Sequence, residues 1–197
     1  MVTAGIAWAS VPRLPGLEAT AAGGPATAIS LRGNRNAMAH EAVKLHGRVS
    51  PGGTRRVVIE VGGRKLRAQT QADGTYKAHW RAPRSGVYVA RARVDDASVR
   101  SRSIRINAYR PAVASYYGPG LYGGGLACGG TLTPGKLGVA HNTLPCRARV
   151  TLRYRGRTVT VPVIDRGPYA GNREYDLTAA TKAELGFPST GNVLTTR

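Results

Sequence analysis

The chain has 197 residues, with 29 Lys and Arg against 10 Asp and Glu, and a formal net charge of +19. This length fits one large domain or two small ones, and 42% hydrophobic residues suffice for a buried core. No run of roughly 18 or more apolar residues exists, so we expect no transmembrane helix. The charge favours polyanionic partners, namely nucleic acid, anionic lipid or an acidic wall polymer.

The residue types further restrict the expected secondary structure and the expected partners. The 26 Gly, 12 Pro and single Phe predict many turns and short strands rather than long helices. The basic residues are spread along the chain, which disfavours a nucleic-acid-binding tail, and no helix-turn-helix, RNP or zinc-finger motif occurs. We therefore expect no nucleic-acid partner.

Residues 1–40 are rich in Ala, Gly, Pro and Thr and show no regular hydrophobic period, which predicts a leader and a disordered linker. Residues 1–10 are apolar and end in small residues, but they lack the positive start of a signal peptide. This segment is either the tail of a longer signal or a flexible end.

Residues 41–108 predict a small antiparallel β-sandwich with an immunoglobulin-like pattern. Short alternating or β-branched runs are separated by turn residues at regular spacing, which is typical of such a fold. The six expected strands span 43–49, 55–61, 65–70, 76–80, 87–94 and 99–106. We expect Trp80 to be the core aromatic residue, whereas His40, His46 and His79 have no Cys or carboxylate at metal-ligand spacing. Residues 108–113 are expected to be a short linker.

Residues 112–197 form the second predicted domain, whose composition shifts toward Gly and Tyr. Strands are expected at 149–154 and 158–165, followed by a helix capped by Thr178 and ended by Gly186 and Pro188. The Gly-rich segment 123–130 lacks the pattern of a phosphate-binding loop, so it suits close backbone approach to a ligand or a tightly wound barrel.

The two cysteines, Cys128 and Cys146, flank one loop of this domain. Two cysteines cannot build a four-thiolate zinc site, and a single disulfide in an oxidising compartment fits their placement. Two buried free thiols are the alternative. A disulfide closing this loop would stabilise the fold by about 3 kcal/mol.

An apolar run that starts at Val161 delivers Asp165 to a turn at Gly167-Pro168. Acidic residues are scarce, so a carboxylate placed at a strand end is a candidate site residue. Alternatively, Asp165 caps the turn or pairs with Arg166.

Four segments in this half together resemble a known family. They are Ala-Ser-Tyr-Tyr-Gly from 114, Ala-His-Asn-Thr-Leu-Pro from 140, Val-Ile-Asp-Arg-Gly-Pro-Tyr from 163 and Tyr-Asp-Leu-Thr from 175. Residues 114–190 resemble the rare lipoprotein A family of septal lytic transglycosylases, and are similar to expansins and family-45 endoglucanases. The resemblance implies an all-β chain whose C-terminal domain is a six-stranded double-psi β-barrel with a short helix, secreted to act on wall polysaccharide, with no cofactor or metal.

The resemblance also implies roles for individual residues. Asp165 matches the family's acid, His141 matches the His placed near it, and Asp176 matches the acid of the expansin-like relatives. Thr131 stands where family members commonly carry a Glu, so a second site carboxylate is missing unless Asp176 supplies it. The remaining expected substrate-binding residues are Tyr116, Tyr117, Tyr122, Arg166 and Tyr169, although half of the tyrosines are expected to pack the barrel.

Two functions follow from this pattern. The first is a monomeric lytic transglycosylase that cleaves peptidoglycan glycan strands, with Asp165 acting first as acid and then as base. A lytic transglycosylase needs only one carboxyl group, because the C6 hydroxyl of the sugar attacks. The second is a non-catalytic, expansin-like protein that binds or loosens wall polymer, and Thr131 in place of Glu favours it.

Overall fold

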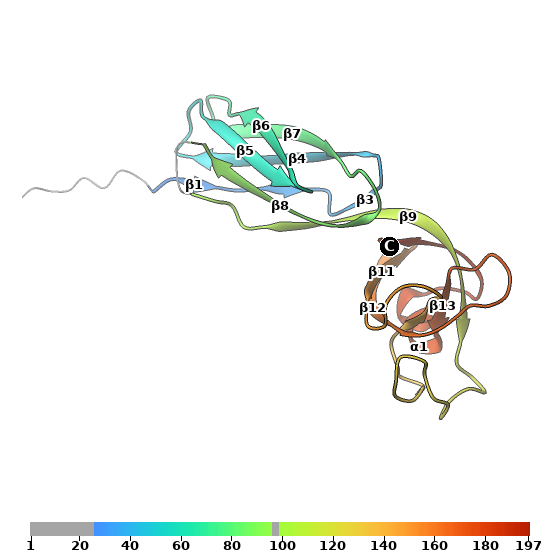
Figure 1. Cartoon of the computed structure of the whole chain (residues 1–197). Helices are drawn as coiled ribbons and strands as arrows, with labels where there is room; N and C mark the ends of the chain where they lie inside the picture. The colour runs from blue at the N-terminus through green and yellow to red at the C-terminus, as the bar shows by residue number, and fades with distance from the viewer. Residues whose placement is uncertain (1–25, 96–98) are drawn as a thin grey trace, which may run out of the picture.

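The structure, a computed structural model, describes residues 26–95 and 99–197. The described residues form two all-β regions joined by one long strand (Figure 1). The expected leader up to residue 25 and residues 96–98 lie outside the described residues. Among the described residues, no helix has the length and apolar character needed to cross a membrane.

The first region is a β-sandwich, as the strand pattern predicts. Its strands are β1 (Ala28–Ile29), β2 (Arg32–Gly33), β3 (Asn36–Met38), β4 (Ala42–Ser50), β5 (Arg56–Val61), β6 (Arg64–Gln69), β7 (Thr75–Arg81), β8 (Gly86–Val94) and the first half of β9 (Ile104–Tyr117). One sheet has β4 at its centre, with β1 and β2 on one side and β7 on the other. The facing sheet runs β6-β5-β8-β9, and β3 adds to β9.

The sandwich core fills the space between these two sheets. Alternate residues of β4 are buried, so Val43 and Leu45 face the second sheet. Trp80 is 3% exposed and packs edge-on against Tyr88, which confirms its expected place in the core. The expected disordered linker was wrong for residues 28–38, because β1 to β3 pair there with β4 and β9.

The second region is a closed barrel of six strands. These are the second half of β9, β10 (Val139–Ala140), β11 (Arg149–Tyr154), β12 (Arg157–Asp165), β13 (Tyr175–Thr178) and β14 (Gly191–Thr195). The order β13-β10-β12-β11-β14-β9 closes on itself because β9 also pairs with β13. The expected all-β fold with a six-stranded barrel is therefore confirmed.

The barrel's helix, α1 (Ala179–Leu185), also forms as predicted. The Thr178 side chain accepts the N–H of Thr181, and Gly186 ends the helix in the left-handed conformation at φ 66°. Leu185 is fully buried among the barrel's apolar residues. The helix therefore closes one end of the barrel core.

Strand β9 connects the two regions without a break. Its residues 104–108 pair with β8 of the sandwich, and residues 110–114 pair with β14 of the barrel. The short linker expected at 108–113 is thus part of a continuous strand, whose hydrogen bonds fix its conformation (Figure 1). A single continuous β-strand therefore links the sandwich to the barrel.

Candidate functional site

Four barrel strands bring the candidate carboxylates into one row. Ala140 of β10 pairs with Asp165 of β12 on one side and with Asp176 of β13 on the other. Asp176 in turn pairs with Ser115 of β9. The register of β10 against β12 shifts between Val139 and Ala140, and both aspartates are backbone neighbours of Ala140 across the sheet. Their Cα atoms are two strand spacings apart, about 10 Å.

One oxygen of the Asp165 carboxylate holds two segments of backbone. Oδ1 accepts the N–H groups of Ala127 in the Gly-rich loop and of Arg166, each at 2.9 Å. Within residues 26–95 and 99–197, Oδ2 accepts no hydrogen bond. The turn-capping alternative is therefore right for one oxygen, while the other is open to a ligand.

Arg166 does not pair with the carboxylate beside it. Its Nη1 donates to the carbonyl oxygens of His141 at 3.2 Å and Asp165 at 3.5 Å, and its Nη2 lies 3.3 Å from the Cys146 sulfur. No ion pair joins Arg166 to Asp165 in the described part of the chain. The guanidinium group therefore ties the ends of β10 and β12 to the disulfide.

His141 is buried and organises the turn that follows β10. Its Nδ1 accepts the N–H groups of Thr143 and Leu144, so the neutral ring carries its proton on Nε2. Nε2 lies 3.6 Å from Glu174 Oε1, and the ring packs on Tyr175. Its side chain makes no hydrogen bond to the Asp165 carboxylate, although its backbone N–H donates to the Asp165 carbonyl at 3.2 Å.

Burial lowers the pKa of His141, against the opposing effect of the nearby Glu174 carboxylate. The neighbouring Asn142 donates from Nδ2 to the Pro168 carbonyl at 2.8 Å. The His-Asn pair of the second motif therefore fixes two loops, its own and the turn after Asp165.

Glu174 is a site-proximal carboxylate that the sequence analysis missed. It forms a two-pronged ion pair with Arg110 of β9, and it also faces His141. Burial raises the pKa of Glu174, but the hydrogen bonds and charge of Arg110 outweigh this and hold it below the usual value. Its partner lies in a distant part of the sequence, so no local pattern marked the pair.

Asp176 and Tyr117 complete the row on the β13 and β9 side. Ser115 donates its hydroxyl to Asp176 Oδ1. The Tyr117 hydroxyl is buried and has no hydrogen-bond partner among the described residues. Burial raises the pKa of Tyr117, and the negative charges of Asp165 and Asp176 raise it further. An unpartnered polar group thus lies within electrostatic reach of both carboxylates.

The other predicted substrate-binding residues lie on the surface. Tyr116 and Tyr122 are 38% and 40% exposed, and Tyr169 is 84% exposed. The Lys182 ammonium lies 4.2 Å from the centre of the Tyr116 ring. Thr131 is exposed and pairs with Gly125 across the Gly-rich loop. These rings lie at the open surface, which suits a long polymer better than a small enclosed ligand.

Glycines allow the backbone to reach this arrangement. A side chain on Gly138 would lie 2.4 Å from Ile164, the residue before Asp165, so only Gly permits this approach of β10 to β12. Gly167 adopts φ 117°, which favours glycine in the turn after Asp165.

The predicted disulfide between Cys128 and Cys146 is confirmed. The Cys128 N–H donates to the Ile164 carbonyl, and the Arg147 N–H donates to the Val163 carbonyl. The cross-link therefore clamps the Gly-rich loop and the loop before β11 onto the last residues of β12. Within the described ranges, no group of three or more His, Cys, Asp or Glu side chains is placed to hold a metal ion.

Comparison with known proteins identifies this barrel. The double-psi β-barrel family described as "Lytic transglycolase" matches residues 112–196. Residues 112–196 belong to the RlpA-like double-psi β-barrel family. The "Probable endolytic peptidoglycan transglycosylase RlpA" of Synechocystis sp. is 36% identical over 109 residues, which cover 54% of this chain and 32% of that protein.

A second RlpA relative, the "Endolytic peptidoglycan transglycosylase RlpA" of Campylobacter jejuni, is 38% identical over 81 residues, covering 40% of this chain and 30% of that protein. A third, from Pseudomonas aeruginosa strain UCBPP-PA14, is 40% identical over 87 residues, covering 43% of this chain and 26% of that protein. The chain spans about a third of the length of the curated relatives it matches.

Proposed function

We propose that the barrel cleaves peptidoglycan glycan strands as a lytic transglycosylase, with Asp165 as the acid and base. The observation that carries this proposal is the state of the Asp165 carboxylate. One oxygen is fixed by two backbone N–H groups, and the other is open at the end of a barrel strand. The RlpA relatives, named as peptidoglycan transglycosylases, support the choice of substrate.

In the proposed reaction, protonated Asp165 gives its proton from Oδ2 to the glycosidic oxygen, and the bond between that oxygen and the sugar C1 breaks. The Asp165 carboxylate then takes the proton of the C6 hydroxyl of the same sugar. The C6 oxygen attacks C1 and closes a 1,6-anhydro ring. The proton that Asp165 lost is thereby recovered, and no water is consumed.

The surrounding residues would act as follows. The ionised Asp176 carboxylate, one strand beyond Ala140, stabilises positive charge that develops on the sugar ring. His141 and Arg166 are positioning residues, because their contacts hold the strand ends and loops around Asp165. The exposed rings of Tyr116, Tyr122 and Tyr169 contact the glycan strand.

The products of peptidoglycan digestion test this proposal. We expect the purified chain to release fragments with anhydro-muramoyl ends, detected by mass spectrometry. Asp165→Asn should lower the rate by about 10²–10⁴-fold, the usual contribution of a general acid. Asp95→Asn, in the sandwich, is the matched control and should retain the activity.

Two other outcomes would contradict the proposal. Fragments with reducing ends would indicate hydrolysis, in which Asp165 and Asp176 act as a pair of carboxyl groups around a water. Sedimentation with peptidoglycan but no released fragment would favour the expansin-like alternative. Thr131 in place of Glu supports that alternative.

A further inference from the structure

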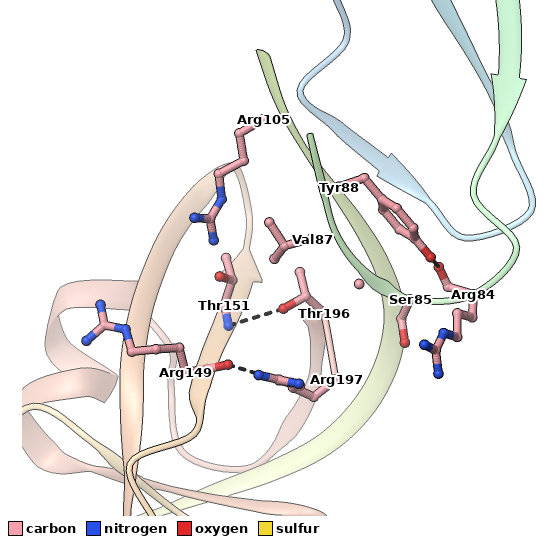
Figure 2. Close-up of a pocket in the computed structure, with 10 residues that line it drawn as sticks. Arg84, Ser85, Val87, Tyr88, Arg105, Arg149, Thr151, Thr196 and Arg197 are labelled. Carbon is pink, nitrogen blue, oxygen red and sulfur yellow. Dashed lines mark hydrogen bonds between the residues drawn. The ribbon is translucent and has the colours of Figure 1, made fainter. Parts of the chain in front are cut away.

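A cavity of about 550 Å³ lies between the sandwich and the barrel. The sandwich contributes residues from the turn before β8, from β8 itself and from the β9 residue Arg105. The barrel contributes Arg149 and Thr151 of β11 and the two residues that follow β14. Figure 2 shows the side chains of both regions arranged around this junction. The cavity is separate from the row of Asp165, Ala140, Asp176 and Ser115, since none of these residues lines it.

The lining is strongly basic. Arg84 and Arg105 come from the sandwich, and Arg149 and Arg197 come from the barrel. No Asp or Glu lines the cavity. None of these four guanidinium groups forms an ion pair with any carboxylate of residues 26–95 and 99–197. Four guanidinium groups therefore line one cavity, and none of them has an ion-pair partner among the described residues.

The arginine donors remain largely available. Arg149 uses Nη2 on the Thr160 carbonyl, and Arg197 uses Nε on the Arg149 carbonyl. Arg105 uses only Nε, on Asn107. A guanidinium group carries five N–H donors, so each of these side chains retains donors for a ligand. Its planar fork matches the two oxygens of a phosphate or a carboxylate.

The walls of the cavity are held in place. Strand β9 runs unbroken from the sandwich into the barrel. On the barrel side, Thr196 and Thr151 exchange hydrogen bonds, and Arg197 bonds to the Arg149 carbonyl (Figure 2). A pre-arranged set of donors loses little conformational entropy when a ligand binds.

The outer face of the sandwich continues this basic surface away from the cavity. Val89 of β8 pairs with Arg105, and Arg91 and Arg93 follow on the same face of β8. Arg93 lies opposite Val58, which in turn lies opposite Arg67 of β6. Glu60 and Asp95 offset part of this charge through their ion pairs with Arg93. A ligand with repeated negative groups would contact both the cavity and this face.

We propose that this interdomain cavity binds the oxyanion groups, phosphate or carboxylate, of an anionic polymer. The site would hold the chain on an acidic wall polymer, independently of whether the barrel cleaves glycan strands. Its binding energy would come from charge-assisted hydrogen bonds at one place, in addition to the diffuse attraction of the +19 net charge.

Binding of long-chain polyphosphate and of polygalacturonate to the full chain, measured by calorimetry near 0.15 M salt, tests the proposal. The variant Arg105→Gln/Arg149→Gln should weaken binding of at least one polymer by about tenfold or more. Arg32→Gln/Arg81→Gln removes the same charge from the other sheet and should weaken it less than about threefold. A loss confined to polyphosphate or to polygalacturonate identifies the group that the cavity takes, and a loss for both supports a general oxyanion site.

Equal losses for the two variants, or no binding by the unchanged chain, would overturn the proposal, because charge alone would then explain the attraction. Thermal melting of each variant checks that it folds. If the Arg105→Gln/Arg149→Gln chain does not fold, amide NMR shifts of the unchanged chain during a pyrophosphate titration provide the answer. Shifts centred on Val87, Thr151 and Thr196 are expected, and shifts spread over both regions would contradict the site.

Discussion

The sandwich and the barrel are both built from short strands, but they place their charged residues differently. In the sandwich, Glu60 and Asp95 pair with Arg93 at the surface, and Asp73 pairs with Arg48. In the barrel, Asp165 and Asp176 lie in one row. One oxygen of Asp165 accepts a backbone N–H, and one oxygen of Asp176 accepts the Ser115 hydroxyl. In the described structure, Asp165 and Asp176 therefore each keep one oxygen that accepts no hydrogen bond.

The difference follows from strand pairing. Apart from the parallel pair of β3 with β9, the sandwich is made of antiparallel pairs, such as β5 with β6, which are neighbours in sequence. The barrel contains parallel pairs, β10 with β12 and β13 with β9, which join residues far apart in the chain. Parallel pairing requires crossover connections, and these bring the ends of distant strands together. Such a meeting of strand ends can assemble a site that no single hairpin offers.

The disulfide gives the largest expected difference between the two regions. Cys128→Ser/Cys146→Ser should lower the free energy of unfolding of the barrel by about 3 kcal/mol, because the open loop gains freedom in the unfolded chain. Hydrogen exchange should accelerate in β11 and β12 and stay unchanged in β5 and β8. Equal acceleration in both regions would show that they unfold as one unit.

The Glu174 cluster gives a pH-dependent difference of intermediate size. The pKa values of Glu174 and His141 are both lowered in the folded barrel, so the unfolded chain takes up these protons first as the pH falls. Stability should therefore be complete above about pH 6.5 and decline toward and below pH 4.5, through the lowered folded pKa values.

Glu174→Gln should cost about 1–2 kcal/mol at pH 7, because Arg110 loses its charged partner, and it should flatten the decline below pH 4.5. The sandwich variant Glu60→Gln loses only an exposed ion pair and should change stability by less than about 0.5 kcal/mol. Thermal melts from pH 8 to pH 3.5 measure both. If the stability of Glu174→Gln declines below pH 4.5 as steeply as that of the unchanged chain, the pH dependence comes from other groups.

The hydroxyl groups of two tyrosines, the buried Tyr76 and the half-buried Tyr117, give the smallest expected difference. The Tyr76 hydroxyl in the sandwich donates to the Ser30 carbonyl, whereas the Tyr117 hydroxyl in the barrel has no partner in the described structure. Tyr76→Phe should cost about 1 kcal/mol, and Tyr117→Phe should be neutral or stabilise by about 1 kcal/mol.

In the proposed reaction Tyr117→Phe should change the rate by less than about threefold, because the buried hydroxyl does not contact the sugar. Denaturant unfolding and peptidoglycan digestion measure the two effects. A Tyr117→Phe barrel that loses stability as Tyr76→Phe does would show that this hydroxyl already has a structural partner.

Local sequence patterns determined where many strands and the helix of this protein form. Alternating apolar residues and, for β5, a run of β-branched residues predicted the strands from β4 to β8, which pack on the sandwich core. Thr178 and Gly186 fixed the ends of α1 through capping chemistry that operates within a few residues. Asp165 was found because an apolar strand ends at a glycine turn, and Cys128 and Cys146 were found because only two cysteines exist.

Only the tertiary structure decided what lies beside these residues. Distant segments are joined by the pairing of Ala140 with both aspartates, by the Glu174–Arg110 ion pair and by the close approach of Gly138 to Ile164. These contacts arise from parallel and antiparallel pairing within the closed barrel. The cavity with Arg105 and Arg149 exists because β9 continues from one sheet into the other, where a linker was expected. Such contacts depend on register and closure, which strand periodicity does not specify.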